Sequence, residues 1–317
     1  MSLVEQALKR AKAEGRPTPL STATPQATGT SELAVAATTS PVQLPPEQLI
    51  EPSPEITATI QPLKSIEIDF DLLRNFGYLP PPEQEREISE QYRHIKRPLL
   101  ARALGRGTPR HENGTVVMVT SALMGEGKTF SAINLALSLS LETDAAVLLV
   151  DADTAKPQVS KAFGLQNEPG LVDALLDESC DVESLVTLTN VPKLAILPAG
   201  RTAESAAELL ASDRMGTVLR RLTALSPNRI VLLDCPPLLI TNEAKAIVDA
   251  VGQAVLVVQA NQTPQQAVID AIGHFREDQF VGLVLNQSET VAGYGYGYGY
   301  YGRMYEYGQP GSGRGDR

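Results

Sequence analysis

Short apolar runs separated by longer amphipathic stretches dominate the last two thirds of the chain. Strands buried on both faces give continuous apolar runs, whereas strands with one solvent-exposed face alternate. Helical periodicity separates most of these runs, which predicts an α/β fold with a mainly parallel sheet between layers of helices. The expected strands span residues 115–120, 147–150, 194–197, 230–233, 254–258 and 281–285, and the main helices span 129–141, 203–225, 243–250 and 264–275.

The region before these runs has a different pattern. Residues 1–16 carry one short amphipathic helical pattern, in which Ser2 and Glu5 match a capping box. Residues 17–82 are rich in Pro, Ser and Thr and lack a sustained apolar period. Such a segment cannot bury enough surface to offset the entropy of ordering, so we expect a disordered linker.

The folded domain is expected to span residues 83–290. It begins with a charged amphipathic helix over residues 83–103, which we expect to be interrupted near Pro98. Residues 291–317 form a Gly- and Tyr-rich tail that we expect to be disordered.

Composition and charge narrow the function classes. The 317-residue chain has a formal net charge of -10 at pH 7, which argues against a general nucleic-acid binder. Its two cysteines, Cys180 and Cys235, cannot form a disulfide framework, which indicates a reducing compartment such as the cytoplasm. No apolar stretch reaches the roughly 18 residues that a membrane-spanning helix needs.

The first predicted strand leads into a glycine-containing turn and then into a helix. Gly125 and Gly127 would let backbone N–H groups point inward at a bound phosphate, with the helix dipole adding to the attraction. Lys128 would reach the β- and γ-phosphates and Thr129 would ligate Mg²⁺. Ala122 replaces the first glycine of the usual motif. The predicted nucleotide-binding residues are Met124, Gly125, Glu126, Gly127, Lys128 and Thr129.

Three aspartates follow two of the other predicted strands. Asp151 and Asp153 end one strand, and Asp234 ends another. Because ligands of open α/β sheets bind at the carboxyl ends of the strands, we expect these carboxylates to converge on one Mg²⁺. Each aspartate alone would equally suit a helix cap. Cys235 is expected to be a packing residue, because the three histidines are scattered along the sequence and none lies near it.

These segments together resemble the bacterial tyrosine kinase (BY-kinase) family, which implies a three-layer P-loop NTPase fold and ATP-dependent phosphorylation of tyrosine. By this resemblance, Lys128 and Thr129 hold the phosphates and Mg²⁺, Asp153 and Asp234 hold the metal, and Asp151 is the base for the tyrosine hydroxyl. The division of labour between Asp151 and Asp153 stays open. Asn286, at the end of the last strand, matches a position that reads adenine in related ATPases, or it is a simple strand-end polar residue.

The same resemblance implies a function for the tail, because a terminal tyrosine cluster is the family's autophosphorylation target. Neighbouring subunits would then present their tails to one another. Glu90, Arg93 and Lys96 resemble the family's self-association motif, with Lys in place of the final Arg, or they form a solvated helix face. The predicted targets are Tyr294, Tyr296, Tyr298, Tyr300, Tyr301, Tyr305 and Tyr307.

A narrower resemblance links residues 1–8, 95–100 and 151–157 to the tyrosine autokinase of exosortase A (XrtA/PEP-CTERM) exopolysaccharide loci. It implies regulation of exopolysaccharide synthesis or export. The implied partners are a second copy of the chain, a membrane protein that determines polysaccharide chain length, and a cognate tyrosine phosphatase. That membrane protein would hold the kinase at the inner face of the inner membrane. Met124 stands where Pro is common in the wider family, and Ala155 stands where Arg is common.

Two other functions compete with this interpretation. A partition or septum-positioning ATPase has the same fold, but its signature lysine would stand at Leu123. An ATP-sensing scaffold without kinase activity would use the tyrosines as an adhesive tail.

Overall fold

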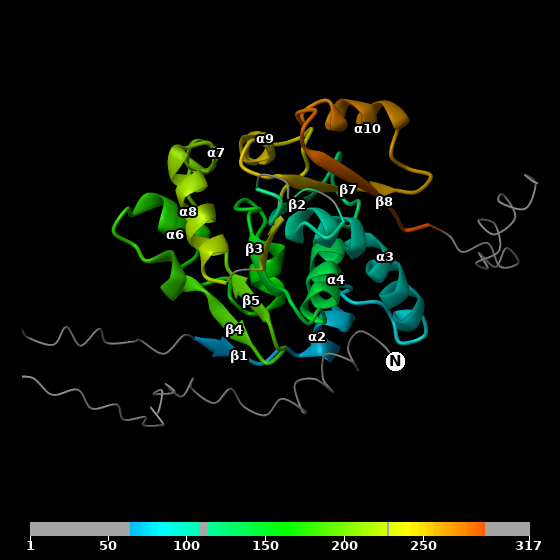
Figure 1. Cartoon of the computed structure of the whole chain (residues 1–317), viewed down its shortest axis with the longest axis horizontal. Coiled ribbons are helices and arrows are strands. Elements are labelled where there is room, and N and C mark those ends of the chain that lie inside the picture. The colour runs from blue at the N-terminus through cyan, green and yellow to red at the C-terminus, as the bar shows by residue number, and fades with distance from the viewer. Residues whose placement is uncertain (1–63, 108, 110–112, 227, 289–317) are drawn as a thin grey trace, which may run out of the picture.

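The computed structural model describes residues 64–107, 109, 113–226 and 228–288. An eight-stranded sheet runs through this part of the chain in the order β1-β4-β5-β3-β6-β2-β7-β8 (Figure 1). Every neighbouring pair is parallel except β4 and β5. The strands are β1 (Ser65–Ile66), β2 (Val116–Ser121), β3 (Ala146–Asp151), β4 (Thr187–Thr189), β5 (Leu194–Leu197), β6 (Arg229–Asp234), β7 (Gln253–Gln259) and β8 (Phe280–Asn286).

Helices cover both faces of the sheet, which confirms the predicted three-layer α/β fold. Successive residues of a strand point to opposite faces. Val117 and Val119 of β2 therefore join the core under α2 to α5, while Val116 and Met118 join the core under α6 to α10. The helices are α2 (Phe70–Asn75), α3 (Glu85–Leu104), α4 (Lys128–Ser140), α5 (Gln158–Ala162), α6 (Leu171–Leu176), α7 (Ala206–Leu210), α8 (Asp213–Ala224), α9 (Asn242–Val248) and α10 (Gln265–Ile272), with one 3₁₀ helix at Val182–Leu185.

The sequence-based prediction was wrong at two helices. The single helix expected over residues 203–225 is two helices, because Ser212 adopts an extended conformation and begins α8 as its N-cap. In contrast, α3 continues through Pro98 without interruption. Proline removes only one backbone donor, and the buried side chains of Leu99, Leu100 and Ala103 hold the turns after it against the core.

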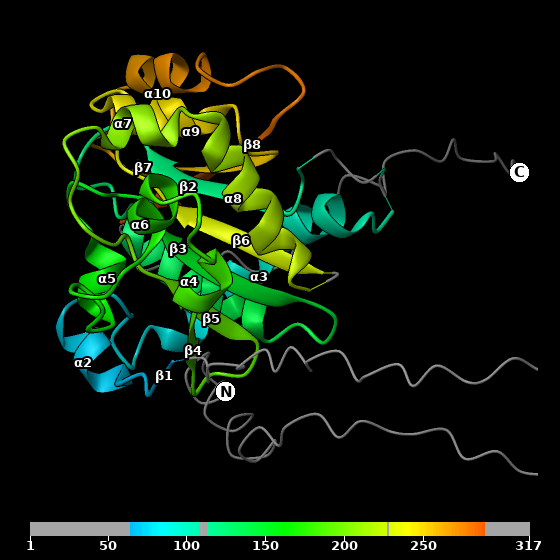
Figure 2. The ribbon, with the colours of Figure 1, turned by 90° about the vertical axis from the view of Figure 1, so that its left-hand side faces the viewer.

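The predicted linker over residues 17–82 ends too late. Residues 64–82 belong to the folded domain: β1 pairs with β4, and Phe70 and Leu73 of α2 are buried in the core. Figures 1 and 2 show β1 and α2, in blue, beside β4. The pairing joins residues more than 100 positions apart, so no local pattern reveals it. Residues 1–63 and 289–317, including the predicted N-terminal helix and tyrosine tail, lie outside the described residues.

Within the described residues, no helix combines the length and the apolar character that crossing a bilayer requires.

Candidate functional site

The phosphate loop predicted from sequence connects β2 to α4. Gly125 and Gly127 have φ angles of 83° and 90°, in the left-handed region that favours glycine. Gly127 is the N-cap of α4 and supplies no side-chain cap to the first turn. A Cβ atom at Gly127 would also clash with the side-chain amide of Asn286. The loop therefore needs glycine at this position both for its conformation and for space.

Glu126 supports the loop from inside the protein. Its side chain is buried; Oε2 accepts a hydrogen bond from the backbone N–H of Leu123 (2.6 Å), and the Thr263 hydroxyl donates to Oε1. The Asn286 side-chain amide donates to the Glu126 carbonyl (2.9 Å). The Glu126 carboxylate thus holds the loop and does not face a ligand, whereas Met124 stands exposed at the loop tip.

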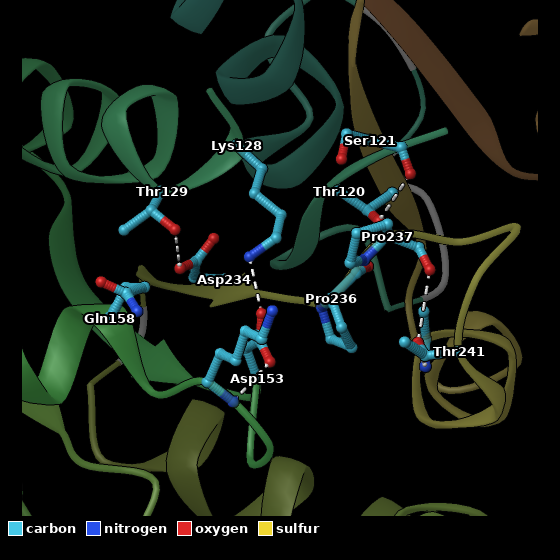
Figure 3. Close-up of polar contacts among 12 residues, drawn as sticks. Thr120, Ser121, Lys128, Thr129, Asp153, Gln158, Asp234, Pro236, Pro237 and Thr241 are labelled. Atoms are coloured by element: carbon cyan, nitrogen blue, oxygen red, sulfur yellow. Dashed lines mark hydrogen bonds and ion pairs between the residues drawn. The ribbon is translucent and has the colours of Figure 1, made fainter. Parts of the chain in front are cut away.

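The structure brings the predicted lysine, threonine and two of the three aspartates together. The Lys128 Nζ lies 2.7 Å from Asp153 Oδ2, and the Thr129 hydroxyl donates to Asp234 Oδ2 over 2.8 Å (Figure 3). These side chains come from α4 and from the carboxyl ends of β3 and β6, which lie side by side in the sheet. Parallel neighbouring strands end at the same edge of a sheet, which explains why residues so distant in sequence meet.

Asp151 is oriented differently from the other two carboxylates. Its Oδ2 accepts hydrogen bonds from both the backbone N–H and the hydroxyl of Ser160, each at 2.7 Å, and its Oδ1 accepts a longer bond from the N–H of Asp153. The Asp151 side chain is fully buried. Ser160 was not predicted from sequence, because a serine on a short helix carries no distinguishing pattern.

Burial and mutual repulsion set the charge state of this cluster. Burial raises the pKa of Asp151 to about 7, and the charge of Asp234 adds to the rise. Burial likewise raises the pKa of Asp234 to about 6, although Lys128 and Thr129 oppose it. For Lys128, burial lowers the pKa, but Asp234 and Asp153 outweigh this effect and raise it overall. Burial also raises the pKa of the Cys235 thiol, which fits a packing role.

The donor set fits a magnesium ion. Asp234 Oδ1 is buried without a hydrogen-bond partner, and its other oxygen already holds the Thr129 hydroxyl. In the described residues no cluster of three or more His, Cys, Asp and Glu forms a protein-only metal site. Mg²⁺ at nucleotide sites is held by one or two protein oxygens together with water and phosphate, so the two observations agree.

Tyr78 and Gln158 form a contact beside the site that the sequence did not predict. The Tyr78 hydroxyl donates to Gln158 Oε1 over 2.7 Å, and the Asn134 side-chain amide donates to the Tyr78 carbonyl over 2.9 Å. Burial raises the pKa of Tyr78, with further contributions from Asp234 and Asp151. The one available signal was the apolar cluster at residues 76–80, within a segment interpreted as linker.

The other predicted site residues lie apart from the loop or have another environment. Asn286 lies at the end of β8 and contacts the loop backbone. Glu90 and Arg93 lie on α3, and Glu90 is exposed. Lys96 is not an exposed interface residue as predicted: it is buried, and its Nζ contacts Glu142 Oε1 (2.8 Å) and the carbonyl of Ser138 (2.7 Å). The tail tyrosines lie outside the described residues.

The amino-acid sequence is similar to a known domain family and to known proteins. Residues 114–277 match the family described as an AAA domain. The chain is 34% identical over 183 residues to the tyrosine-protein kinase YwqD of Bacillus subtilis, which covers 58% of this chain and 73% of the relative. It is 30% identical over 182 residues to the tyrosine-protein kinase CpsD of Streptococcus agalactiae serotype Ia, covering 56% and 77%.

Solved structures are similar over most of the described residues. The crystal structure of the VpsO kinase domain aligns with a TM-score of 0.54 at 28% identity, covering 66% of this chain and all of that one. The chimerical protein CapA2B2 aligns with a TM-score of 0.55 at 22% identity, covering 72% and 94%, and supports the fold alone.

Proposed function

The chain belongs to the bacterial tyrosine-protein kinase family, and on that premise we propose that it is an ATP-dependent autokinase that phosphorylates its own C-terminal tyrosines. The observation that carries the proposal is the pairing of Lys128 with Asp153 and of Thr129 with Asp234 at the uncapped N-terminus of α4. A helix N-terminus with a lysine, a hydroxyl and two carboxylates suits a nucleoside triphosphate and its metal.

Each residue has a defined task in this proposal. Lys128 would exchange its contact with Asp153 for the β- and γ-phosphates, and the loop N–H groups would hold the phosphate oxygens. Thr129, Asp153 and Asp234 would hold Mg²⁺, in part through water. The ion would supply positive charge that stabilises the charge developing on the phosphate during transfer. Asn286 would contact the adenine ring only with the part of its side chain that is not bound to the loop.

The proposed reaction needs one base. The tyrosine oxygen attacks the γ-phosphorus, the bond between this phosphorus and the ADP oxygen breaks, and the phenolic proton passes to a carboxylate. The family resemblance assigns this task to Asp151, whose raised pKa of about 7 lies near neutrality, where a base is most effective. Its buried carboxylate is bound to Ser160, so these hydrogen bonds would have to open before it reaches a tyrosine. We expect activity to rise with pH to a plateau above about 7. Asp151→Asn should lower turnover about 100-fold or more and remove that dependence.

Intact mass after incubation with ATP and Mg²⁺ tests the proposal. We expect successive increments of about 80 Da, one for each phosphate added, that map to Tyr294–Tyr307 and are absent in Lys128→Met. Lys161→Met, which removes an exposed lysine on α5, is the matched control and should keep the increments. ADP release without a mass change would instead indicate an ATPase switch. The absence of both ADP release and a mass change would indicate a scaffold.

Transfer between subunits has its own test. A Lys128→Met chain with an intact tail is mixed with an active chain in which the seven tail tyrosines are Phe. We expect phosphate to appear on the Lys128→Met chain. An unmodified Lys128→Met chain would contradict transfer in trans.

Self-association is proposed to use Glu90 and Arg93, without the buried Lys96. Seven phosphotyrosines would add roughly -10 to -14 charges, at about -1.5 to -2 each, to a chain whose net charge is -10. We therefore expect phosphorylation to disperse the assembly. Sedimentation that gives the same size for Lys128→Met and for the fully phosphorylated chain would contradict this.

The biological setting is also a proposal. The resemblance of residues 1–8, 95–100 and 151–157 to the exosortase A-associated autokinase supports a role in regulating exopolysaccharide synthesis or export. We propose that a membrane protein determining polysaccharide chain length holds the kinase at the inner membrane, and that a tyrosine phosphatase reverses its phosphorylation. Copurification from membranes, lost when that partner is deleted, tests the first of these links.

A further inference from the structure

A polar cleft with a volume of about 510 Å³ lies between α3 and the segment at the C-terminal end of α4. Its charged lining consists of four cationic side chains and one acid: Arg93, Lys96, Arg97, Arg106 and Glu142. Helix α4 has 13 residues, so this cleft is about 20 Å along the helix from the phosphate loop, at about 1.5 Å per residue. The cleft is therefore separate from the candidate active site.

Two of its arginines lack an acidic partner. Lys96 pairs with Glu142, and Arg106 pairs with Asp144 at 3.1 Å and with Glu142 at 3.8 Å. Neither Arg93 nor Arg97 forms an ion pair with any acid in the described part of the chain. They lie four residues apart on one helix, so they project from the same face. In a chain with a net charge of -10, this is a local concentration of uncompensated positive charge.

The chemistry of the cleft points to an aromatic phosphate. A guanidinium group offers parallel N–H donors that match two phosphate oxygens. Leu100, Ala101 and Leu141 add an apolar wall beside these donors, against which an aromatic ring can pack. A phosphotyrosine side chain combines both features, whereas a free phosphate or a carboxylate uses only the first.

The chain itself carries a segment that would acquire this chemistry. Residues 289–317 contain three acids (Glu289, Glu306 and Asp316) and three arginines (Arg303, Arg314 and Arg317), so their formal charges cancel. Phosphorylation makes the segment strongly anionic. Tyr305 is 17 residues beyond Ser288, and an extended chain of that length reaches roughly 55 Å. This reach exceeds the distance of about 20 Å between the cleft and the phosphate loop, beside which Asn286 ends β8, so the chain's own tail is long enough to enter the cleft.

We propose that the cleft between α3 and α4 binds a phosphotyrosine of the C-terminal segment through Arg93 and Arg97. The inference rests on the proposed kinase function for the source of the ligand. Occupation of the cleft would engage Arg93, which is also proposed to serve self-association. Phosphorylation would then act on assembly through a specific contact as well as through charge repulsion.

Binding of a synthetic peptide tests the site without requiring kinase activity. The probe is a labelled peptide of residues 292–308 with phosphotyrosine at Tyr305, together with its unphosphorylated twin. The protein is the full chain carrying Lys128→Met, whose own tail stays unmodified under the proposed function. Fluorescence anisotropy should show binding of the phosphopeptide and at least tenfold weaker binding of the twin.

Arginine variants locate the binding. Arg93→Ala with Arg97→Ala should weaken phosphopeptide binding at least tenfold, and Arg93→Lys with Arg97→Lys should give an intermediate loss because the charge stays and the paired donors go. Arg220→Ala with Arg221→Ala removes the same charge from α8, on the opposite face of the sheet, and should leave binding unchanged. Thermal melting of each variant reports whether it folds.

Competition separates the ligand sources. Phenyl phosphate should displace the phosphopeptide at lower concentration than inorganic phosphate does. Equal displacement by both, equal binding of the two peptides, or unchanged binding in the alanine variant would overturn the proposal. So would arginine-dependent binding to phosphatidylglycerol vesicles in the absence of phosphopeptide binding, which would indicate a lipid surface. Absence of autophosphorylation in the wild-type chain would refute the proposed function instead, because the peptide is phosphorylated by synthesis.

Discussion

The two ends of helix α4 are completed in opposite ways. At its N-terminus, Gly127 supplies no side-chain cap and the first turn carries no acid. At its C-terminus, Lys96 donates to the carbonyl of Ser138 in the last turn, and Lys193 donates to the carbonyls of Glu142 and Thr143 just beyond the helix. The last turn of α4 itself carries no base. The protein therefore satisfies one end internally and leaves the other for a ligand.

This difference shows how one helix can serve structure and function together. A helix leaves unpaired N–H groups at its start and unpaired carbonyls at its end, with partial positive and negative charge respectively. At the negative end, the buried Lys96 donates to one of these carbonyls. The positive end instead faces Asp153 and Asp234, whose partners Lys128 and Thr129 are the residues predicted to meet phosphate and metal.

The largest effect is expected from a substitution at the C-terminal end of α4. Lys96→Met leaves the Ser138 carbonyl without its partner and leaves Glu142 with only the longer, 3.8 Å contact to Arg106. The cost should be about 3 kcal/mol, the low end of the range for buried ion pairs, because the Glu142 side chain is 25% exposed. We expect a loss of this order in the free energy of unfolding, measured in urea, with nucleotide affinity changed less than twofold. Adding Glu142→Gln should recover part of the loss. A stability loss below about 1 kcal/mol would mean that Lys96 does not complete the helix end.

The next largest effect is expected from a substitution at the N-terminal end of α4. Gly127→Ala places a Cβ against Asn286 in a left-handed backbone conformation, which should cost about 2 kcal/mol in stability. Nucleotide affinity, measured by calorimetry, should fall more than tenfold. Gly164→Ala is the matched control, because Gly164 also has a positive φ but has open space around it. It should destabilise the protein by about 1 kcal/mol, through the backbone conformation alone, and leave nucleotide affinity unchanged.

A third test uses the pKa values of the buried carboxylates near the N-terminal end of α4. Their pKa values of about 7 (Asp151) and about 6 (Asp234) exceed the ordinary value, so the folded state holds protons that the unfolded state releases. Stability from this source is complete below about pH 4 and is lost as the pH rises through 6 and 7. We expect the unfolding free energy to fall between pH 5 and 8, less steeply in Asp151→Asn. Parallel slopes for the two proteins would contradict the raised pKa of Asp151.

The smallest effect concerns the contact beside the site. Tyr78→Phe removes the hydrogen bond to Gln158 and should destabilise the protein by about 1 kcal/mol. A double-mutant cycle with Gln158→Met isolates the pair from its packing. The two substitutions should be non-additive in urea unfolding. Full additivity would show that the hydrogen bond contributes nothing.

Local sequence was sufficient wherever one chain segment contains the whole signal. The turn from Ser121 to Thr129 combines glycines, a lysine and a hydroxyl, so the loop between a strand and a helix was predicted correctly, while its binding of phosphate stays a prediction. The six strands were also predicted, each to within one residue at either end. Five are buried as expected, whereas β8 is only partly buried, with Leu283 and Leu285 exposed. The sites of Asp151, Asp153 and Asp234 followed, because parallel strands share one carboxyl edge.

Contacts between distant segments were not available to that reasoning. The pairing of β1 with β4, the burial of Lys96 against Glu142 and the contact of Tyr78 with Gln158 each join residues far apart in sequence. Glu126 was predicted from its place in the loop, but the sequence did not indicate that its carboxylate would bind Thr263 and the backbone of Leu123. A charged residue in a pattern does not reveal which partner it will meet.

Hydrophobic periodicity and turn chemistry are local properties, and they are enough to predict the α/β fold, the loop before α4 and the sheet edge at which the carboxylates gather. The differences among those carboxylates appear only in the folded chain, where Asp151 is held by Ser160 while Asp153 and Asp234 meet Lys128 and Thr129. The same is true of the cations, some of which are buried and paired while Arg93 and Arg97 form no ion pair with another described residue. Desolvation and pairing depend on everything packed around a group, and that environment exists only once the chain has folded.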